Sequence, residues 1–571
     1  MPKSLDPKLA SAPPETDIVR AVFEGLTETD PRTLVEIPAA AEKWEASNGF
    51  RTWMFFIRKD AKWSNGESVT AHDFVRSWKR LVGVGTENAH GYLIDNIVGM
   101  SSERESDQPI TEESADFLKD SEIRNENSQV DSNINTNSTV DDRPSANIAD
   151  IDNADAPPAL NRKITSEAPL NRKIGVEAVS DHILRVDLLR PDKEFPQLAA
   201  HSIFRPVYDD GKQFAGANLN STVITNGPFG IDAIGPEGIT LKRADFYWDR
   251  DSVKIDSIRM IPLGTVEMAL DAYRAGEIDA ISNAEFKPLV LKLLTPYGDF
   301  RKTTHGALNF YDVNTESVPF NDRRVREALA ITINRERITE GEMKGTSQPA
   351  YSYLPFRERA VTRLTEDVGK GKELLGKAGY PDGEGFPIIR LVINRNDAQQ
   401  RIAKMVARMW KEELNIETEL VVLEGNGFKA AMETGDFDLI RRGIVLPTTS
   451  TFSNFSAIFG ADRETNVQTL ATDVAGVSTD TPNLFSLESP GTGAGSAGKS
   501  NSNSLSASNP DSFALSEQEA IVEMFAIPLY FPTSYTLVKP YVYGFDSNSL
   551  DAPSLKNVSI DINWKEKQLS E

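Results

Sequence analysis

Polar and apolar residues alternate most regularly just after residue 38. The apolar residues there predict a short helix that ends at Trp44, followed by a turn at residues 47–49, Ser-Asn-Gly. Residues 52–58 then alternate with a period of two, which is typical of a half-buried strand. The side chains expected on its buried face are Trp53, Phe55 and Ile57.

A second turn at residues 64–66, again Ser-Asn-Gly, separates this strand from a helical pattern. Thr70 stands where a helix N-cap is expected, since its hydroxyl can accept a hydrogen bond from a backbone N–H of the first turn. The spacing of the residues after it predicts a helix with one apolar side. That side carries Phe74, Val75, Trp78 and Leu81.

Strands and helices also alternate farther along the chain. Residues 175–191 predict a hairpin that turns at Ser180 and Asp181. Residues 386–397 predict a strand, 398–414 an amphipathic helix and 417–423 another strand. This succession predicts an α/β architecture in which helices pack on sheets.

Two segments interrupt the pattern. Residues 101–173 are rich in Asp, Glu, Asn and Ser, and residues 471–512 are rich in Ser, Gly, Asn and Thr. Both have too few apolar residues to offset the entropy lost on folding, so we expect both to be disordered and dispensable for stability. The run around residues 493–500 has the spacing of a phosphate-binding loop, but no strand or helix pattern flanks it, so we reject nucleotide binding.

Composition narrows the classes of function. The chain has 571 residues, which predicts two or three domains, and its net charge is −23. Such a charge disfavours nucleic acid and anionic membranes as partners. The absence of cysteine excludes disulfides and zinc–thiolate sites. Residues 1–8 lack the apolar region of a signal peptide, so we expect a longer precursor; the alternative is a protein that stays in the cytoplasm.

No arrangement of residues predicts catalysis. The five histidines form no metal-ligand or nucleophile motif, and we expect His72 to lie on the surface. Asp436 and Asp438 could act as paired carboxylates, but a turn leading into a strand is the more ordinary reading of this segment. We expect neither an enzyme, nor a cofactor, nor a metal site.

Eight blocks in order resemble the extracytoplasmic solute-binding proteins of family 5, which include the oligopeptide- and dipeptide-binding proteins of ABC transporters. Besides the stretch that ends at Arg80, they are SLDP (4–7), VFEGL (22–26), ITNGPFGI (224–231), FYWDR with YRAGEID (246–250, 273–279), VPFNDRRVREALAITINRERI (318–338), GDFDLIRRG (435–443) and IPLYFPTSYTLVKPYVYGF (527–545). They are spread over the chain from residue 4 to residue 545. A single block would be weak evidence, but their common order is specific.

The resemblance implies a bilobal α/β fold of the periplasmic-binding-protein type, with two mixed-sheet lobes, a third smaller subdomain and a ligand cleft that closes by a hinge. The division it implies has a discontinuous first lobe of residues 1–37, 190–300 and 525–571. The second lobe is 38–189 and the third is 301–524.

The resemblance also implies which residues contact the ligand, which lies extended in such clefts and pairs with the protein main chain. Carried onto this chain, they are Ser11, Ala12, Pro13, Tyr92, Arg441, Gly443, Tyr530 and Phe531. Peptide-binding members have a tryptophan and an aspartate where this chain has Ile444 and Pro447, and a further cleft tryptophan aligns with Gly425. The aspartate holds the α-ammonium of the peptide.

Proline at 447 leaves two alternatives open. Either another carboxylate holds the ligand ammonium, or the ligand is of a different kind, because a buried ammonium without a counter-charge is costly. Arg441 and Arg442 are the charged residues nearest in sequence and favour a carboxylate-bearing or polar neutral ligand, unless they face solvent or pair with an acid such as Asp436. On this basis we expect binding to be insensitive to acetylation of a peptide's amino terminus.

The implied function is that of a monomeric periplasmic or lipid-anchored receptor. It would bind a peptide or peptide-like molecule and deliver it to an ABC permease. The alternative is a ligand-binding or chaperone-like protein of the same fold that takes no part in transport.

Overall fold

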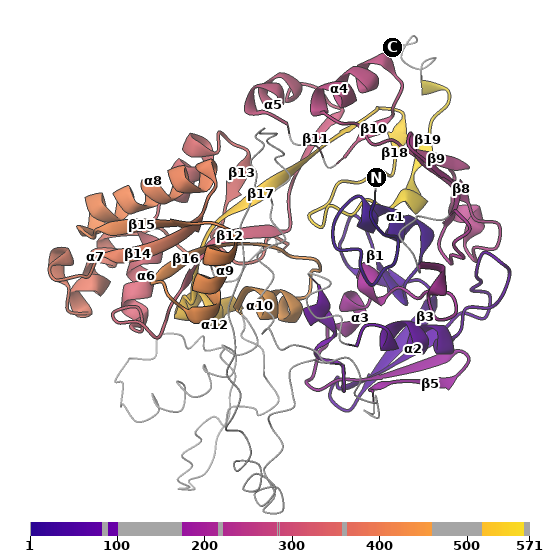
Figure 1. Ribbon diagram of the computed structural model, residues 1–571, viewed down its shortest axis with the longest axis horizontal. Helices are drawn as coiled ribbons and strands as arrows, with labels where there is room; N and C mark the ends of the chain where they lie inside the picture. Colours follow the sequence, from indigo (N-terminus) through magenta and orange to yellow (C-terminus); the bar gives the residue numbers. More distant parts are fainter. Residues whose placement is uncertain are drawn as a thin grey trace, which may run out of the picture.

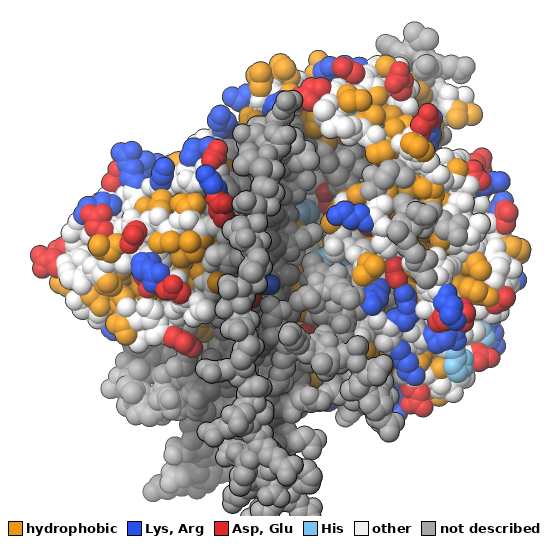
Figure 2. All heavy atoms as spheres, viewed as in Figure 1, with side chains coloured by type: hydrophobic (Ala, Val, Ile, Leu, Met, Phe, Trp, Pro, Cys, Tyr) orange, Lys and Arg blue, Asp and Glu red, His pale blue; other side chains and the backbone are white. Residues whose placement is uncertain are grey.

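The computed structural model describes residues 2–82, 90–100, 174–214, 221–282, 284, 286–356, 363–459 and 517–564. Two α/β lobes lie side by side, and a smaller group of helices and strands sits above them (Figure 1). The two inserts predicted to be disordered, residues 101–173 and 471–512, lie outside the described residues. Acidic and basic side chains are intermingled on the visible faces of both lobes (Figure 2).

The lobe on the left of Figure 1 is built on an eight-stranded sheet with the order β10-β17-β12-β16-β14-β15, in which β11 and β13 also pair with β17. Its strands are β10 (Ala280–Ile281), β11 (Phe300–Thr304), β12 (Ala307–Val313), β13 (Ser347–Pro349), β14 (Ile389–Asn394), β15 (Thr418–Leu423), β16 (Leu439–Val445) and β17 (Ala526–Val538).

Helices cover this sheet and complete its core. Every residue of β12 is buried, as expected for a central strand. Trp410 of α8 is fully buried and donates its indole N–H to the carbonyl of Leu329 at 3.0 Å. The helices are α6 (Arg323–Ile331), α7 (Val368–Lys377), α8 (Asp397–Leu414), α9 (Gly425–Thr434), α10 (Thr451–Phe459) and α12 (Glu517–Glu523).

One long strand, β17, continues from the left lobe into the upper part of the molecule (Figure 1). Its first half pairs with β12 and β13, and its second half pairs with β11 and β10. The upper helices α4 (Val266–Ala275) and α5 (Pro288–Leu294) pack against Leu537 near its end. The two parts of the molecule therefore share a continuous backbone element.

The lobe on the right of Figure 1 has two antiparallel sheets around one apolar core. One sheet has the order β3-β4-β6-β5 and the other β7-β8-β9. The elements are β3 (Ala41–Ser47), β4 (Thr52–Ile57), β5 (Val176–Ser180), β6 (Ile183–Asp187), β7 (Phe229–Gly235), β8 (Gly238–Arg243), β9 (Ser257–Met260), α1 (Glu15–Val22), α2 (Ala71–Lys79) and α3 (Phe195–Leu198). Short pairs complete it: β1 (Thr27–Thr29) with β2 (Glu36–Pro38), and β18 (Val542–Tyr543) with β19 (Ser559–Ile560).

The C-terminal residues return to this right-hand lobe. Lys556 pairs with Asp249 at 2.7 Å, and Arg32 pairs with Asp546 at 2.8 Å. The start of β17, however, belongs to the sheet of the left lobe. The lobe boundaries given above remain a prediction.

The helix predicted to end at Trp44 is wrong. This segment is β3, which pairs antiparallel with β4 through the turn at Asn48 and Gly49. Its Ala, Glu and Lys residues favour a helix locally, but pairing with the strongly apolar β4 outweighs that weak preference. The predicted strand at 52–58, the hairpin at 175–191 and the strand–helix–strand unit at 386–423 are confirmed.

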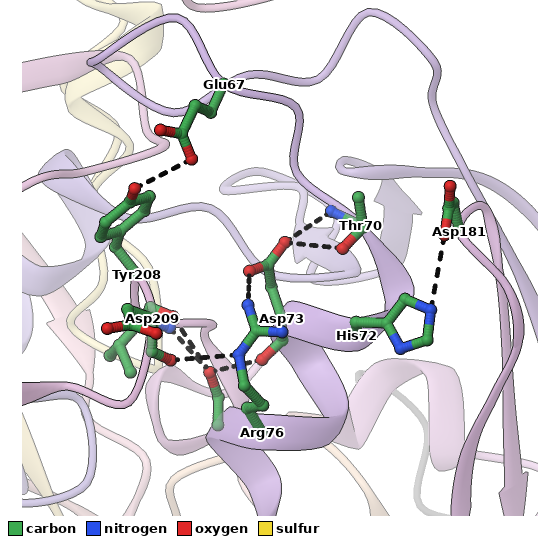
Figure 3. A network of polar contacts seen from close by, with 10 residues as sticks. Glu67, Thr70, His72, Asp73, Arg76, Asp181, Tyr208 and Asp209 are labelled. Carbon is green, nitrogen blue, oxygen red and sulfur yellow. Dashed lines mark hydrogen bonds and ion pairs between the residues drawn. The ribbon is translucent and has the colours of Figure 1, made fainter.

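The predicted helix after Thr70 is α2, and it begins with a capping box (Figure 3). The carboxylate of Asp73 accepts hydrogen bonds from the N–H and the hydroxyl of Thr70, at 2.7 and 2.9 Å. Arg76 also pairs with this carboxylate. His72 points to the surface, as predicted, and lies 3.4 Å from Asp181.

Candidate ligand-binding cleft

A cavity of about 880 Å³ lies between segments that are distant in sequence. Its walls come from residues 11–38, 445–449, 532–535 and 550–557, together with parts of residues 197–202 and 284–291. This volume is within the range of small-molecule sites. The cavity is therefore the candidate site, and each predicted contact residue can be placed relative to it.

The predicted residues Ser11, Ala12 and Pro13 line this cavity. They follow a turn in which the N–H groups of Leu9 and Ala10 donate to the carbonyl of Asp6. The ring of His90 is 3.0 Å from the carbonyl of Ser11, through its Nε2. The contact with His90 thus fixes the position of the segment Ser11, Ala12 and Pro13.

Tyr92 is not among the residues that line the cavity. It packs against the apolar cores of both lobes, where its side chain bridges them. Its hydroxyl is buried without a hydrogen-bond partner among the described residues, and burial raises the pKa of this phenol. The structure therefore places Tyr92 behind the cavity wall, between the two lobes.

Arg441 and Gly443 lie on β16, and neither lines the cavity. Arg441 donates to the side-chain oxygen of Asn309 at 2.6 Å, and Gly443 faces Asn309 across the sheet. Arg442 is buried and pairs with Asp312 at 3.2 Å. The suggestion that these arginines attract a ligand carboxylate thus has no support from the cavity.

Two sequence alternatives in this region are resolved. Asp436 pairs with Arg390 at 3.0 Å and not with Arg442. Asp438 accepts hydrogen bonds from the N–H of Arg390 and the hydroxyl of Ser317, at 2.8 and 3.2 Å. The two carboxylates hold the turn before β16, which is the structural role that the sequence favoured.

Tyr530 and Phe531 are buried within β17, directly before the residues of this strand that line the cavity. The hydroxyl of Tyr530 accepts a hydrogen bond from Gln399 at 2.7 Å. The cavity itself is lined by the next four residues, 532–535. Phe531 and Tyr530 thus lie one and two residues before the first residue of the strand that lines the cavity.

The three positions that depart from the family pattern also have distinct environments. Pro447 lines the cavity, so the missing aspartate would have faced it. Ile444 is packed in the core of the left lobe. Gly425 begins α9 with a φ of 40°, a conformation that favours glycine, and is not a lining residue.

Sequence reasoning missed the charged side of the cavity, which α1 and the residues directly after it provide. Asp17 and Arg20 lie three residues apart on α1, and Glu24 lies two residues beyond its end; all three line the cavity. Asp17 and Arg20 form an ion pair at 2.5 Å, and Glu28 pairs with Arg205 at 2.7 Å. The three-residue spacing of Asp17 and Arg20 was the sequence signal that could have revealed this charged pair.

Glu24 is a buried carboxylate that neutral donors satisfy. It accepts hydrogen bonds from the Tyr247 hydroxyl and from the Trp248 indole, the latter at 2.7 Å. Burial raises its pKa to about 7, although these two hydrogen bonds and nearby Lys556 act in the opposite direction. Lys556 lines the same wall and lies 5.1 and 5.0 Å from the centres of the Tyr247 and Trp248 rings.

Three histidines line the cavity, and all are held neutral. His90 and His201 stack edge to face with ring centres 5.1 Å apart. Burial lowers the pKa of both, and of His305, which lies two residues before β12. The charged residues described on the cavity wall are therefore four carboxylates and two cations, namely Asp17, Glu24, Glu28, Asp551, Arg20 and Lys556.

The lobes also touch beside the cavity. Gln197 donates to the carbonyl of Leu34 at 3.1 Å and contacts the hydroxyl of Thr449. The N–H of Thr451 donates to the carboxylate of Glu194 at 2.8 Å. These contacts tie the start of α10 to the right-hand lobe.

Comparisons with known proteins support the resemblance. The profile of the bacterial extracellular solute-binding proteins, family 5, matches residues 36–466. OppA, the periplasmic oligopeptide-binding protein of Salmonella typhimurium, is 27% identical over 98% of this chain and 90% of its own. YgiS of Escherichia coli, described as a probable deoxycholate-binding periplasmic protein, is 27% identical over 95% of this chain and 89% of its own.

Among solved structures, the unliganded open form of the periplasmic murein tripeptide binding protein MppA matches with a TM-score of 0.64 and 24% identity. The match covers 98% of this chain and 95% of that one, which confirms the predicted bilobal fold with its additional subdomain. Within the described residues, no helix is long and apolar enough to cross a membrane. The chain belongs to the family 5 extracellular solute-binding proteins, which are binding proteins and not enzymes.

Proposed function

We propose that this protein captures a peptide or peptide-like solute in the cavity between its lobes and delivers it to an ABC permease on the periplasmic side of the membrane. The observation that carries this proposal is the cavity of about 880 Å³, whose walls come from both lobes. A ligand bound there contacts both walls at once, so binding favours the closed arrangement of the lobes.

The residues proposed to contact the ligand are the segment Ser11, Ala12 and Pro13 and the neighbourhood of Arg441, Gly443, Tyr530 and Phe531. Tyr92 would act by contacting both cores. Segments 445–449 and 532–535, which directly follow two of these predicted groups, line the cavity and support this assignment. The receptor would act as a monomer without a cofactor.

A second candidate is a ligand-binding or chaperone-like role outside transport. Pro447 favours it, because proline cannot form the ion pair that holds a peptide ammonium. The relative described as deoxycholate-binding and the oligopeptide-binding relative are equally identical to this chain, at 27% each. A non-peptide ligand is therefore tested separately.

Native mass spectrometry of the protein with an equimolar mixture of tri- to pentapeptides tests the first proposal, with deoxycholate in a parallel arm. We expect a one-to-one peptide complex. Ala12→Trp, which fills the cavity, should abolish it, whereas Ala233→Trp at an exposed position of β7 should not. Binding of deoxycholate but no peptide would support the second candidate, and binding of neither would contradict ligand capture by this cavity.

A further inference from the structure

The carboxylate that the family pattern places at position 447 has a spatial neighbour on the C-terminal segment. The N–H of Leu446 donates to the carbonyl of Gly306 at 2.6 Å, and the N–H of Gly306 donates to the carbonyl of Ser549 at 2.5 Å. Gly306 thus joins the residue before Pro447 to a loop that carries Asp551. Pro447 and Asp551 both line the cavity.

The loop that carries Asp551 is held in shape by the buried side chain of Asn548. Its oxygen accepts the N–H groups of Leu550 and Ala552, each at 3.1 Å, and its amide donates to the carbonyl of Ala552 at 3.0 Å. Asp551 adopts a left-handed backbone conformation with a φ of 52°. A carboxylate fixed in this way loses little freedom when it binds a partner.

Asp551 differs from the other carboxylates described on the cavity wall. Asp17 and Glu28 each pair with an arginine, and Glu24 is buried between Tyr247 and Trp248. The side chain of Asp551 accepts a hydrogen bond from the Ser534 hydroxyl at 2.9 Å, and no arginine or lysine of the described residues lies within ion-pair distance of it. Its charge acts on Arg20 and His305 only at longer range, where it raises the pKa of each against the larger effect of burial. It is half-buried and faces the space a ligand would fill.

The charges on the cavity wall as a whole also favour a cationic ligand group. Burial raises the pKa of Glu24 to about 7, and the other three carboxylates still outnumber the two cations. Burial lowers the pKa of the three histidines, so they add no positive charge near neutral pH. An enclosed site with excess negative charge attracts a cation more strongly than a carboxylate. Arg441 and Arg442, which suggested the opposite preference, do not line it.

We propose that Asp551 is a specificity-determining residue that binds the ammonium group of the ligand, in place of the carboxylate absent at Pro447. The inference rests on the proposed function and names the ligand class as a solute with a cationic amino group, such as a peptide with a free amino terminus. It replaces the expectation that acetylation leaves affinity unchanged.

The test measures the affinities of Ala-Phe-Ala and N-acetyl-Ala-Phe-Ala by calorimetry for the wild-type protein and for Asp551→Asn. Asparagine keeps the shape of the side chain and tolerates the left-handed conformation. We expect the wild-type protein to prefer the free peptide by about tenfold, near the lower end for a charge pair because Asp551 is only half-buried. The variant should bind both peptides within about threefold of each other.

Asp256→Asn is the matched control, since this aspartate lies on the same lobe but outside the cavity. It should keep the wild-type preference, and all three proteins should show the same thermal transition. A preference that survives Asp551→Asn, or a wild-type protein without preference, would overturn the inference while leaving peptide capture intact. If neither peptide binds up to about 1 mM, peptide capture itself fails, and the inference fails with it.

Discussion

Leu446 and Ser549 are hydrogen-bonded to the same residue, Gly306, although they lie 103 positions apart in the sequence. The bonds run from the N–H of Leu446 to Gly306 and from the N–H of Gly306 to Ser549. The end of β16 and the C-terminal segment therefore meet at the beginning of β12. This junction forms a corner of the cavity.

Replacing Gly306 with alanine should disturb this junction. The added methyl carbon would lie 2.7 Å from the carbonyl oxygen of Ser549 and 2.9 Å from the ring of Phe356, so one of them must move. We expect a loss of about 1–3 kcal/mol in the free energy of unfolding, measured by urea denaturation, together with weaker peptide binding. Gly298→Ala is the control, because its methyl group meets open space. Equal stability of the two variants would contradict the packing described at Gly306.

Glu24 should make stability depend on pH. Its pKa is about 7 in the folded protein, against an ordinary value of 4.5, so the folded state holds the proton more tightly than the unfolded chain. The resulting stabilisation is fully present below pH 4.5 and is lost as the pH rises through about 7. We expect the wild-type protein to lose up to about 3 kcal/mol relative to Glu24→Gln across this window.

The measurement for Glu24 is urea denaturation at several pH values between 4 and about 8. Glu24→Gln removes one hydrogen-bond acceptor, but this cost is the same at every pH. Glu42→Gln, at an exposed position of β3, should follow the wild-type curve. A wild-type curve parallel to that of Glu24→Gln would show that Glu24 titrates normally.

The buried pair of Arg442 and Asp312 should contribute strongly to folding. Arg442→Met would remove the cation that pairs with the buried carboxylate of Asp312, and we expect a loss of about 3–5 kcal/mol in the free energy of unfolding. Arg390→Met breaks the exposed pair with Asp436 and should cost less than about 1 kcal/mol. Chemical denaturation distinguishes them, and similar losses for both would contradict the burial of Arg442.

The capping box of α2 should stabilise the right-hand lobe. Thr70→Ala removes the hydroxyl that bonds to Asp73, and we expect a loss of about 1 kcal/mol. His72→Ala alters an exposed side chain two residues farther on and should change stability by less than about 0.5 kcal/mol. If the two substitutions have equal effects on the denaturation midpoint, the cap is not formed in solution.

Local sequence patterns predicted most of the helices and strands discussed above, because the residues whose interactions form these elements are close together in the chain. The alternation over 52–58 and the capping signal at Thr70 needed only neighbouring residues to be read correctly. The failure at β3 has the opposite cause: its partner β4 supplies the stabilisation, and a weak helical composition gave no sign of this. The order of the eight blocks then predicted the family and its bilobal fold.

The candidate site was less accessible to sequence reasoning. Ser11, Ala12 and Pro13 line the cavity, but Arg441 and Gly443 lie outside its wall, because pairing with β12 turns them toward Asn309. The charged pair on α1 was visible in the sequence as a spacing of three residues between Asp17 and Arg20. Nothing in the sequence showed that this pair would border the cavity.

By itself, the sequence determined the fold, the family and the loss of a carboxylate at Pro447, since each depends on residue types at local or ordered positions. Only the tertiary structure decided which charges face the cavity. Asp551 is 104 residues from Pro447 in the chain, yet both line the cavity, and hydrogen bonds to the backbone of Gly306 link their neighbours Leu446 and Ser549. Coulomb interactions depend on distance in space and not on distance along the chain. The charges that surround a bound ligand therefore depend on how distant segments pair in the fold.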